Sequence, residues 1–303
     1  MRSSTARAVR TSAAQNPVPR SFVAAPPDTM LFGAVAILVA IGLVMIYSAS
    51  SAVGYAESHD TAHYLKRQFV QLVFGLGAAY AVYRIDYRKL RAAAPYLLVL
   101  SALSLTVVLL PHVGVYVGGA RRWISAGPLS FQPSEFAKLA LVLYLAAVLS
   151  SKGERITSLV HGLVPMCVPV AVMAVLVLKE PDMGTASLLA FTAFTMFFVA
   201  GARFEHLFLI FMVTIPTVVA SIVMSPYKRA RIFAFLDPWK DAQNTGFHIV
   251  QSLFALGTGG LFGVGLGQSR AKFFYLPEQY TDFIFSVLGE ELGVVGAVFV
   301  IVL

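Results

Sequence analysis

Long apolar runs separated by short polar segments dominate the chain from residue 31 to residue 303. Most runs approach the roughly 20 residues that an α-helix needs to cross the hydrocarbon core of a bilayer. Their expected positions are 31–50, 68–83, 93–111, 137–150, 159–178, 183–200, 207–225 and 283–303. A backbone facing lipid must satisfy its own hydrogen bonds, so we expect every run to be helical. The pattern therefore predicts an all-α fold, a polytopic membrane helical bundle with eight spans.

Two stretches depart from this pattern. Residues 1–28 are rich in Ser, Ala, Arg and Pro, which is typical of a disordered tail, and the apolar run after them is too long for a cleaved signal peptide. Residues 226–282 form one long outer loop with prolines and a glycine-rich run, so we expect a functional loop with short helices, for example over 246–256. The chain stops inside an apolar run at Leu303, and we expect it to be a shortened form of a longer protein.

The bulk composition supports a membrane location and excludes several other classes. Of the 303 residues, 58% are hydrophobic and 13% are charged, and the mean hydropathy is +0.76. A soluble domain carries about twice that charged fraction, so the apolar excess must face lipid. Cys167 is the only cysteine, which excludes an internal disulfide and a thiolate metal cluster. The net charge of +8 comes from cations in short loops, a placement that suits a phosphorylated lipid better than nucleic acid.

The distribution of basic residues orients the predicted spans. Basic residues are concentrated in the tail 1–28 and in the loop 84–91, and short basic loops favour the cytoplasmic side. Eight spans then place the loop 226–282 outside, together with many cations and most of the acidic residues. Either the outer face binds an anionic molecule, or the long loop is translocated regardless of its charge. The sequence leaves both interpretations open.

Three acidic residues accompany the last apolar run. Asp282 lies at its predicted outer mouth, where a carboxylate often caps a helix and is stabilised by the helix dipole. Glu290 lies eight residues further on, roughly 12 Å deeper on a similar face, and Glu291 follows it. Acidic residues at such depth usually line a polar cavity. Because a cap explains Asp282 alone, the pattern favours a functional cavity here.

A second group of candidate residues surrounds the expected entry of the fourth span. Arg121 and Arg122 form a pair of the kind that grips phosphate oxygens in a bidentate way. Trp123 is typical of an interfacial membrane anchor. Glu135 and Lys138 lie three residues apart, which is the spacing of an ordinary helix ion pair.

Other local motifs carry weaker signals. Asp182 lies in a tight turn between the fifth and sixth spans, where it is expected to cap the helix of the sixth span. The glycine-rich run 257–267 suits either backbone contacts to a phosphate or close helix packing, which is commoner in membranes. The histidines lack a partner at ligand spacing, so no structural zinc site is expected.

At these motifs the chain resembles the shape, elongation, division and sporulation (SEDS) proteins of bacteria. The run LPE–TDFIF–GEELG is the most specific, and FLDPWKD with the FYLPE lead-in is most similar to the FtsW branch, while the RodA and sporulation branches stay open. The matching segments are 119–124, 132–138, 180–185, 231–241, 251–267 and 275–293. Family members have ten helical spans and a large outer loop. The resemblance thus implies a SEDS-type transmembrane domain over 29–303 that lacks the last two spans.

The resemblance implies an enzyme that polymerises lipid II, an undecaprenyl-diphosphate-linked disaccharide pentapeptide, into peptidoglycan strands. Asp282 matches the family's essential aspartate and is the expected general base of an inverting displacement. Arg122 and Trp123 match an essential arginine and its neighbouring tryptophan. Charge on the diphosphate leaving group needs cations, with or without a divalent metal such as Mg²⁺ or Mn²⁺. The candidate substrate-binding residues are Arg121, Arg122, Trp123, Glu135, Lys138, Asp182, Arg231, Lys272, Glu278 and Glu290.

The same resemblance implies partners and a cellular location. Family members act with a class B penicillin-binding protein, which supplies transpeptidation, and with other divisome membrane proteins in the bacterial plasma membrane at the division septum. Two further functions stay open: a flippase that moves lipid II across the bilayer, which Glu290 would serve equally well, and a non-catalytic division scaffold. A scaffold does not need the outer grouping of Asp282 with cations.

Overall fold

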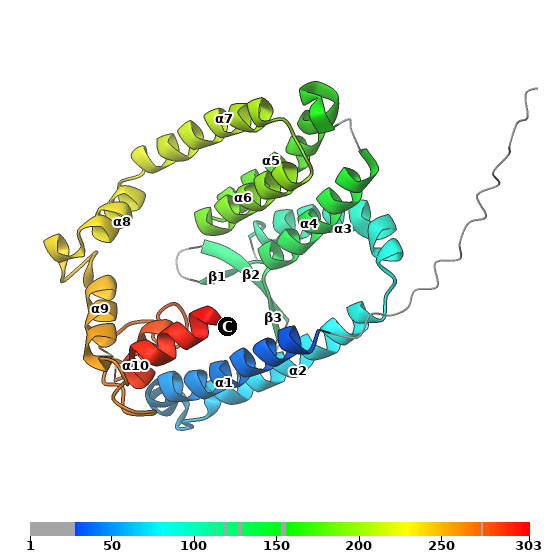
Figure 1. Ribbon diagram of the computed structural model, residues 1–303. Coiled ribbons are helices and arrows are strands. Elements are labelled where there is room, and N and C mark those ends of the chain that lie inside the picture. The colour runs from blue at the N-terminus through cyan, green and yellow to red at the C-terminus, as the bar shows by residue number, and fades with distance from the viewer. Residues whose placement is uncertain (1–27, 112, 118–119, 127–128, 153–155, 274) are drawn as a thin grey trace, which may run out of the picture. The chain divides into compact units, whose positions relative to one another are not determined.

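All eight apolar runs form helices in the computed structural model, which describes residues 28–111, 113–117, 120–126, 129–152, 156–273 and 275–303 (Figure 1). Among these described residues, six helices are long and apolar enough to cross a membrane. They are α1 (Thr29–Ser58), α3 (Tyr87–Val108), α4 (Pro133–Lys152), α5 (Val164–Lys179, preceded by the π-helical turn Leu159–Leu163), α7 (Phe204–Val223) and α10 (Ile284–Val302). The other two predicted spans are occupied by α2 (His63–Tyr83) and by the shorter α6 (Met183–Val199). A multi-pass helical architecture is confirmed, and the number of eight spans stays a prediction.

The long segment 226–282 contains further helical elements. These are α8 (Pro226–Leu236), the 3₁₀ turn η3 (Pro238–Asp241) and α9 (Phe247–Gly259). The helix expected over 246–256 therefore coincides with α9. The tail predicted over residues 1–28 lies outside the described residues, except for Asp28, whose carboxylate caps α1.

A small antiparallel sheet between α3 and α4 departs from the predicted all-α fold. Its strands pair in the order β1 (Val115–Val117), β2 (Ala120–Ala126) and β3 (Leu129–Phe131). Arg121 pairs with Tyr116 and Trp123 pairs with Val115, so Arg122 between them has no partner on β1 and forms a bulge in β2. A bulge interrupts the alternation of side chains along a strand and re-aims the side chain that it carries. The paired grip of Arg121 and Arg122 that the sequence suggests stays a prediction.

By their contacts the described residues divide into two units. The central unit covers residues 66–251, and the terminal unit combines the described residues up to Leu65 with residues 252–303. In the central unit α3 packs against α4, α5 packs against α6, and β2 contacts both α3 and α4. Fully buried side chains fill its core, among them Leu105, Leu141, Met173, Leu189 and Phe197. This core positions the strand that carries Arg122.

In the terminal unit α10 packs against α1 and is broken at Gly293, whose φ of 69° and ψ of −170° lie outside the helical region. A break removes backbone hydrogen bonds on both of its sides. The segment 260–265, which follows α9, replaces these bonds at 3.0–3.1 Å. Before the break, the amides of Val264 and Gly265 donate to the carbonyls of Glu290 and Glu291, respectively. After the break, the amides of Val294 and Val295 donate to the carbonyls of Gly260 and Leu261, respectively. Irregular backbone in a span is tolerated where protein groups satisfy it in this way.

Glycine is required where the segment 260–265 meets the break. Gly263 has a φ of +80°, and a Cβ atom there would lie 2.1 Å from the carbonyl oxygen of Glu291. A Cβ atom at Gly293 would lie 2.4 Å from the amide nitrogen of Gly263. The two backbones come this close only because both residues lack side chains. This use favours the packing interpretation of the glycine-rich run over phosphate binding.

Candidate active site

Asp282 presents an exposed carboxylate two residues before α10. The helix begins at Ile284 with Phe283 in the cap position, and no side-chain cap is formed. The interpretation of Asp282 as a helix cap is therefore wrong. Within the part of the chain that the structure describes, no residue donates a hydrogen bond to this carboxylate. Asp282 thus combines a fixed backbone position with a side chain that remains available to another molecule.

A tight turn ahead of Asp282 sets that backbone position. Glu278 has a φ of 53°, and its carbonyl accepts hydrogen bonds from the amides of Thr281 and Phe283, both at 3.2 Å. The hydroxyl of Thr281 also donates to the Glu278 carboxylate at 2.9 Å. Gln279 is buried, and its side-chain amide donates to the carbonyl of Lys272 at 2.9 Å. These contacts hold residues 278–283 as one structured unit, so Glu278 organises the turn that carries Asp282.

The C-terminal end of α1 and the start of α2 support the same turn. The ring of Tyr64 packs against Tyr280 with centroids 4.4 Å apart. The hydroxyl of Tyr64 donates to the carboxylate of Glu57 at 2.5 Å. Neither Glu57 nor Tyr64 was singled out by the sequence, because the contact between Tyr64 and Tyr280 joins segments more than 200 residues apart.

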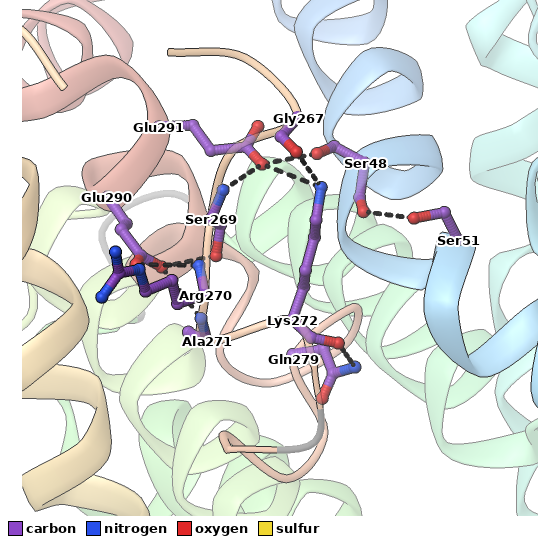
Figure 2. Close-up of polar contacts among 10 residues, drawn as sticks. All are labelled: Ser48, Ser51, Gly267, Ser269, Arg270, Ala271, Lys272, Gln279, Glu290 and Glu291. Atoms are coloured by element: carbon purple, nitrogen blue, oxygen red, sulfur yellow. Dashed lines mark hydrogen bonds and ion pairs between the residues drawn. The ribbon is translucent and has the colours of Figure 1, made fainter. Parts of the chain in front are cut away.

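Below the turn, Glu290 is buried and receives three hydrogen bonds from the loop that precedes the turn (Figure 2). The Ser269 hydroxyl and the amides of Arg270 and Ala271 donate to its carboxylate, the two amides at 3.0 and 3.2 Å. Three donors satisfy much of the hydrogen-bonding capacity of a carboxylate. Glu290 therefore anchors the loop 269–271 to α10, whereas the sequence interpretation had it bind substrate.

Glu291 ties the same loop to α1 (Figure 2). Its carboxylate accepts a hydrogen bond from the hydroxyl of Ser48 at 2.6 Å and lies 3.7 Å from the ammonium of Lys272. Lys272 is itself buried and donates to the carbonyl of Gly267 at 2.5 Å. Lys272 was expected to contact the diphosphate, and its burial and internal partners favour a structural role instead. Together, Glu290 and Glu291 fix the loop that leads to Asp282.

In the central unit, Arg122 clamps β2 to the turn between α5 and α6. Its Nε donates to the carbonyl of Glu180 at 2.8 Å, and its Nη2 donates to the carbonyl of Pro181 at 2.7 Å. Asp182 caps α6 by accepting from the amide of Thr185 at 3.0 Å and from its hydroxyl at 2.8 Å, which confirms the predicted cap. The arginine fork thus organises a turn, with Nη1 making no hydrogen bond to a described residue.

The remaining candidates of the central unit lie on separate elements. Glu135 and Lys138 form the ion pair predicted from their spacing, at 2.7 Å on the first turn of α4. Trp123 on β2 is partly exposed. The guanidinium of Arg231 stacks over the ring of Tyr227 at 4.7 Å on α8, with its side chain exposed. These contacts leave the charges of Lys138 and Arg231 close to solvent.

Glu180 is a candidate that sequence reasoning did not select. Its side chain is 1% exposed. Burial, with a smaller contribution from the nearby Asp182, raises the pKa of its carboxyl from 4.5 to about 7, and Arg122 opposes this shift. From the sequence alone, an acidic residue beside a proline is expected in an exposed loop. Its burial was not predicted because it depends on packing between distant segments.

A divalent cation remains a prediction. Among the described residues, no three His, Cys, Asp or Glu side chains come together as a metal site. Mg²⁺ in transferases is often held by one or two carboxylates together with substrate phosphates. The exposed carboxylate of Asp282 fits one such ligand, which leaves the remaining positions to the substrate and water.

The fold and these sites define a class: a multi-pass helical membrane protein that presents an exposed carboxylate at the mouth of a broken helix. The chain belongs to the FtsW/RodA/SpoVE family of cell cycle proteins, whose family model matches residues 28–303. The resemblance inferred from the motifs is therefore confirmed.

Two relatives from this family are similar to most of the chain. The stage V sporulation protein E of Bacillus subtilis is 42% identical over 277 residues, covering 91% of this chain and 76% of the relative. The probable peptidoglycan glycosyltransferase FtsW of Trichlorobacter lovleyi is 43% identical over 282 residues, covering 93% and 74%.

Two solved structures share the fold. A structure described as a peptidoglycan synthase complex that coordinates polymerization and crosslinking matches with a TM-score of 0.70 and 33% identity, covering 90% of this chain and 74% of the matched chain. The rod shape determining protein RodA of Thermus thermophilus matches with a TM-score of 0.60 and 29% identity, covering 90% and 70%.

Proposed function

We propose that this chain is a peptidoglycan glycosyltransferase that polymerises lipid II into glycan strands for septal wall synthesis. The observation that carries the proposal is the exposed Asp282 carboxylate, held by the Glu278 turn at the start of α10. Relatives named as probable peptidoglycan glycosyltransferases support the same reaction. The protein would act in the bacterial plasma membrane with a class B penicillin-binding protein and other divisome membrane proteins, as the match to a peptidoglycan synthase complex suggests.

The proposed reaction is a direct displacement at the anomeric carbon of a lipid-linked sugar. The acceptor hydroxyl loses its proton to the Asp282 carboxylate as its oxygen forms a bond to the anomeric carbon. The bond from that carbon to the diphosphate oxygen breaks, and undecaprenyl diphosphate leaves with the electron pair. A single displacement inverts the anomeric configuration. The apolar spans allow the isoprenoid chain to remain in lipid during the reaction.

Developing negative charge on the diphosphate requires nearby cations. Arg121, Lys138 and Arg231 carry charges on exposed or half-buried side chains. Arg122 directs two of its nitrogens to the α5–α6 turn and retains Nη1 for a substrate oxygen. Lys272 is buried in its ion pair with Glu291. We therefore expect it to stabilise the loop and not to contact the diphosphate.

The decisive experiment is synthesis of glycan from lipid II by the purified chain together with its class B penicillin-binding protein in lipid vesicles. Glycan formation supports the polymerase. Transfer of lipid II between leaflets without polymerisation supports the flippase. Neither activity, with retained binding to the partner, supports a scaffold.

Arg122→Lys is expected to lower polymerisation by roughly tenfold, because an ammonium keeps the charge but cannot bridge two carbonyls and a substrate oxygen. Initial rates with lipid II measure the effect. Arg203→Lys is the matched control, since Arg203 is an exposed arginine before α7 that makes no side-chain cap and keeps its charge in that variant. If both variants polymerise lipid II at the rate of wild type, Arg122 has no role in the reaction beyond that of a surface cation.

The orientation of the chain is testable with a membrane-impermeant maleimide, in a variant with Cys167→Ala. Tyr275→Cys, at a position 65% exposed in the loop before Asp282, is expected to react in intact spheroplasts. Lys89→Cys, at an exposed position in the predicted cytoplasmic loop, is expected to react only after lysis. Gln279 is unsuitable as a labelling position because it is buried. The reverse labelling pattern would place Asp282 in the cytoplasm and contradict the proposed function.

A further inference from the structure

The Glu180 carboxyl is buried in the turn between α5 and α6 without a hydrogen-bond partner. Its side chain is 1% exposed, and neither of its oxygens is hydrogen-bonded to any described residue. A buried polar group without a partner is costly, and an ionised one is far more so. An unpartnered carboxyl is therefore retained against its cost to folding, which points to a use outside the fold itself.

The neighbours of Glu180 are committed to other contacts. Arg122 directs Nε and Nη2 to the carbonyls of Glu180 and Pro181 rather than to the carboxyl. Asp182 is occupied by its two hydrogen bonds from Thr185. The turn is thus rigidly held while one acidic group within it stays unsatisfied.

A second buried polar group without a hydrogen-bond partner in the described part of the chain lies on α4, which packs against α5 and α6. The hydroxyl of Ser134, in the first turn of α4, is fully buried and makes no hydrogen bond to a described residue. α4 contacts α5, α6 and β2, the strand that carries Arg122. Unsatisfied polar groups therefore recur on the elements that surround the clamp of Arg122.

The charged residues around this turn are Arg121 and Arg122 on β2, Glu135 and Lys138 on α4, Lys179 at the end of α5, and Asp182 in the turn. Of these, Asp182 and Arg122 affect the ionisation of Glu180. Desolvation dominates and raises the pKa of Glu180 to about 7, with Asp182 adding to the shift and Arg122 opposing it. Below that pH the carboxyl is neutral and acts as a hydrogen-bond donor.

We propose that Glu180 is a substrate-binding residue whose neutral carboxyl donates a hydrogen bond to a phosphoryl oxygen of the lipid-linked diphosphate. The inference rests on the proposed function and adds a residue to it. The Nε of Arg122 already binds the backbone carbonyl of Glu180, so the neutral acid and the guanidinium belong to the same turn and together offer donors to an anionic oxygen. An ionised carboxylate at the same place repels that oxygen, so binding weakens as Glu180 loses its proton.

The test measures the KM for lipid II between pH 6 and pH 8.5 in wild type and three variants. The KM of each variant is divided by the KM of wild type at the same pH. The KM of wild type is expected to rise with pH. Glu180→Gln, which is neutral at every pH and still donates, is expected to keep the low KM and to lose this rise. Glu180→Met, which cannot donate, is expected to raise the KM on the order of tenfold at pH 6 with kcat retained. Glu205→Gln, at an exposed acid of α7, is the control and is expected to follow wild type.

Two outcomes overturn the inference. A Glu180→Gln variant that loses binding at every pH would show that the ionised carboxylate holds a cation. A Glu180→Gln variant that keeps the pH dependence of wild type would assign that dependence to another group.

A second readout separates this inference from the proposed function. Binding of inorganic pyrophosphate, measured by calorimetry on the detergent-solubilised chain, is expected to show the same difference between wild type and Glu180→Gln. If lipid II is not polymerised but pyrophosphate binding shows this difference, the polymerase proposal fails and the anion site at Glu180 stands. Equal pyrophosphate binding by both proteins at pH 6 and pH 8.5 contradicts the site.

Discussion

Asp282→Asn is expected to lower the rate of lipid II polymerisation by roughly two to four orders of magnitude, the usual contribution of a general base. Asparagine has nearly the same shape but does not accept the proton of the acceptor hydroxyl. The exposed Asp282 carboxylate receives no hydrogen bond from a described residue, so its replacement is not expected to disturb the fold. Initial rates with the class B penicillin-binding protein present measure the effect.

The matched control for this variant is Asp237→Asn. Asp237 is likewise exposed and follows α8, but it has no place in the proposed reaction. Its rate is expected to equal that of wild type, and the thermal stability of both variants is expected to be unchanged. Normal turnover by Asp282→Asn would remove Asp282 from the mechanism.

Gly293→Ala is expected to destabilise the terminal unit and to abolish activity as a consequence. A side chain at a φ of 69° costs about 1–3 kcal/mol, and its Cβ would collide with the backbone of Gly263 and of Leu261. Relief of this collision requires the segment 260–265 to move away, which breaks the hydrogen bonds that close the gap in α10. A lower apparent melting temperature in detergent and a reduced monodisperse yield measure the effect.

Gly257→Ala is the matched control for the glycine prediction. Gly257 is helical in α9, and an added Cβ there has no heavy atom within 4 Å. Alanine is also the better helix former. The melting temperature of this variant is expected to be unchanged or higher. A Gly293→Ala protein as stable as wild type would show that α10 is not broken at this residue.

The apolar runs were predictable because length and hydrophobicity are local properties of the sequence. α1, α7 and α10 lie where those properties place them. The small sheet was not predicted, since β1 and β3 have only three residues each and two arginines interrupt the apolar character of β2. Strands this short are specified by their pairing rather than by their own sequence.

The candidate residues show the same division between local and distant causes. The cap at Asp182 and the Glu135–Lys138 pair follow from spacing alone and were predicted. The depth of Glu290 indicated a polar cavity, whereas the structure gives its carboxylate a loop about 20 residues earlier in the chain as partner. The buried state of Glu180 depends on contacts between helices, so a linear motif does not reveal it.

The gap in α10 has a consequence for the insertion of this protein into the membrane. An ordinary span enters lipid as an autonomous helix, because all of its backbone hydrogen bonds are internal. α10 is not autonomous in that sense, since four of its backbone groups are completed by the segment 260–265. Bare amides and carbonyls are costly in hydrocarbon. We therefore expect α10 to insert stably only together with the segment that follows α9.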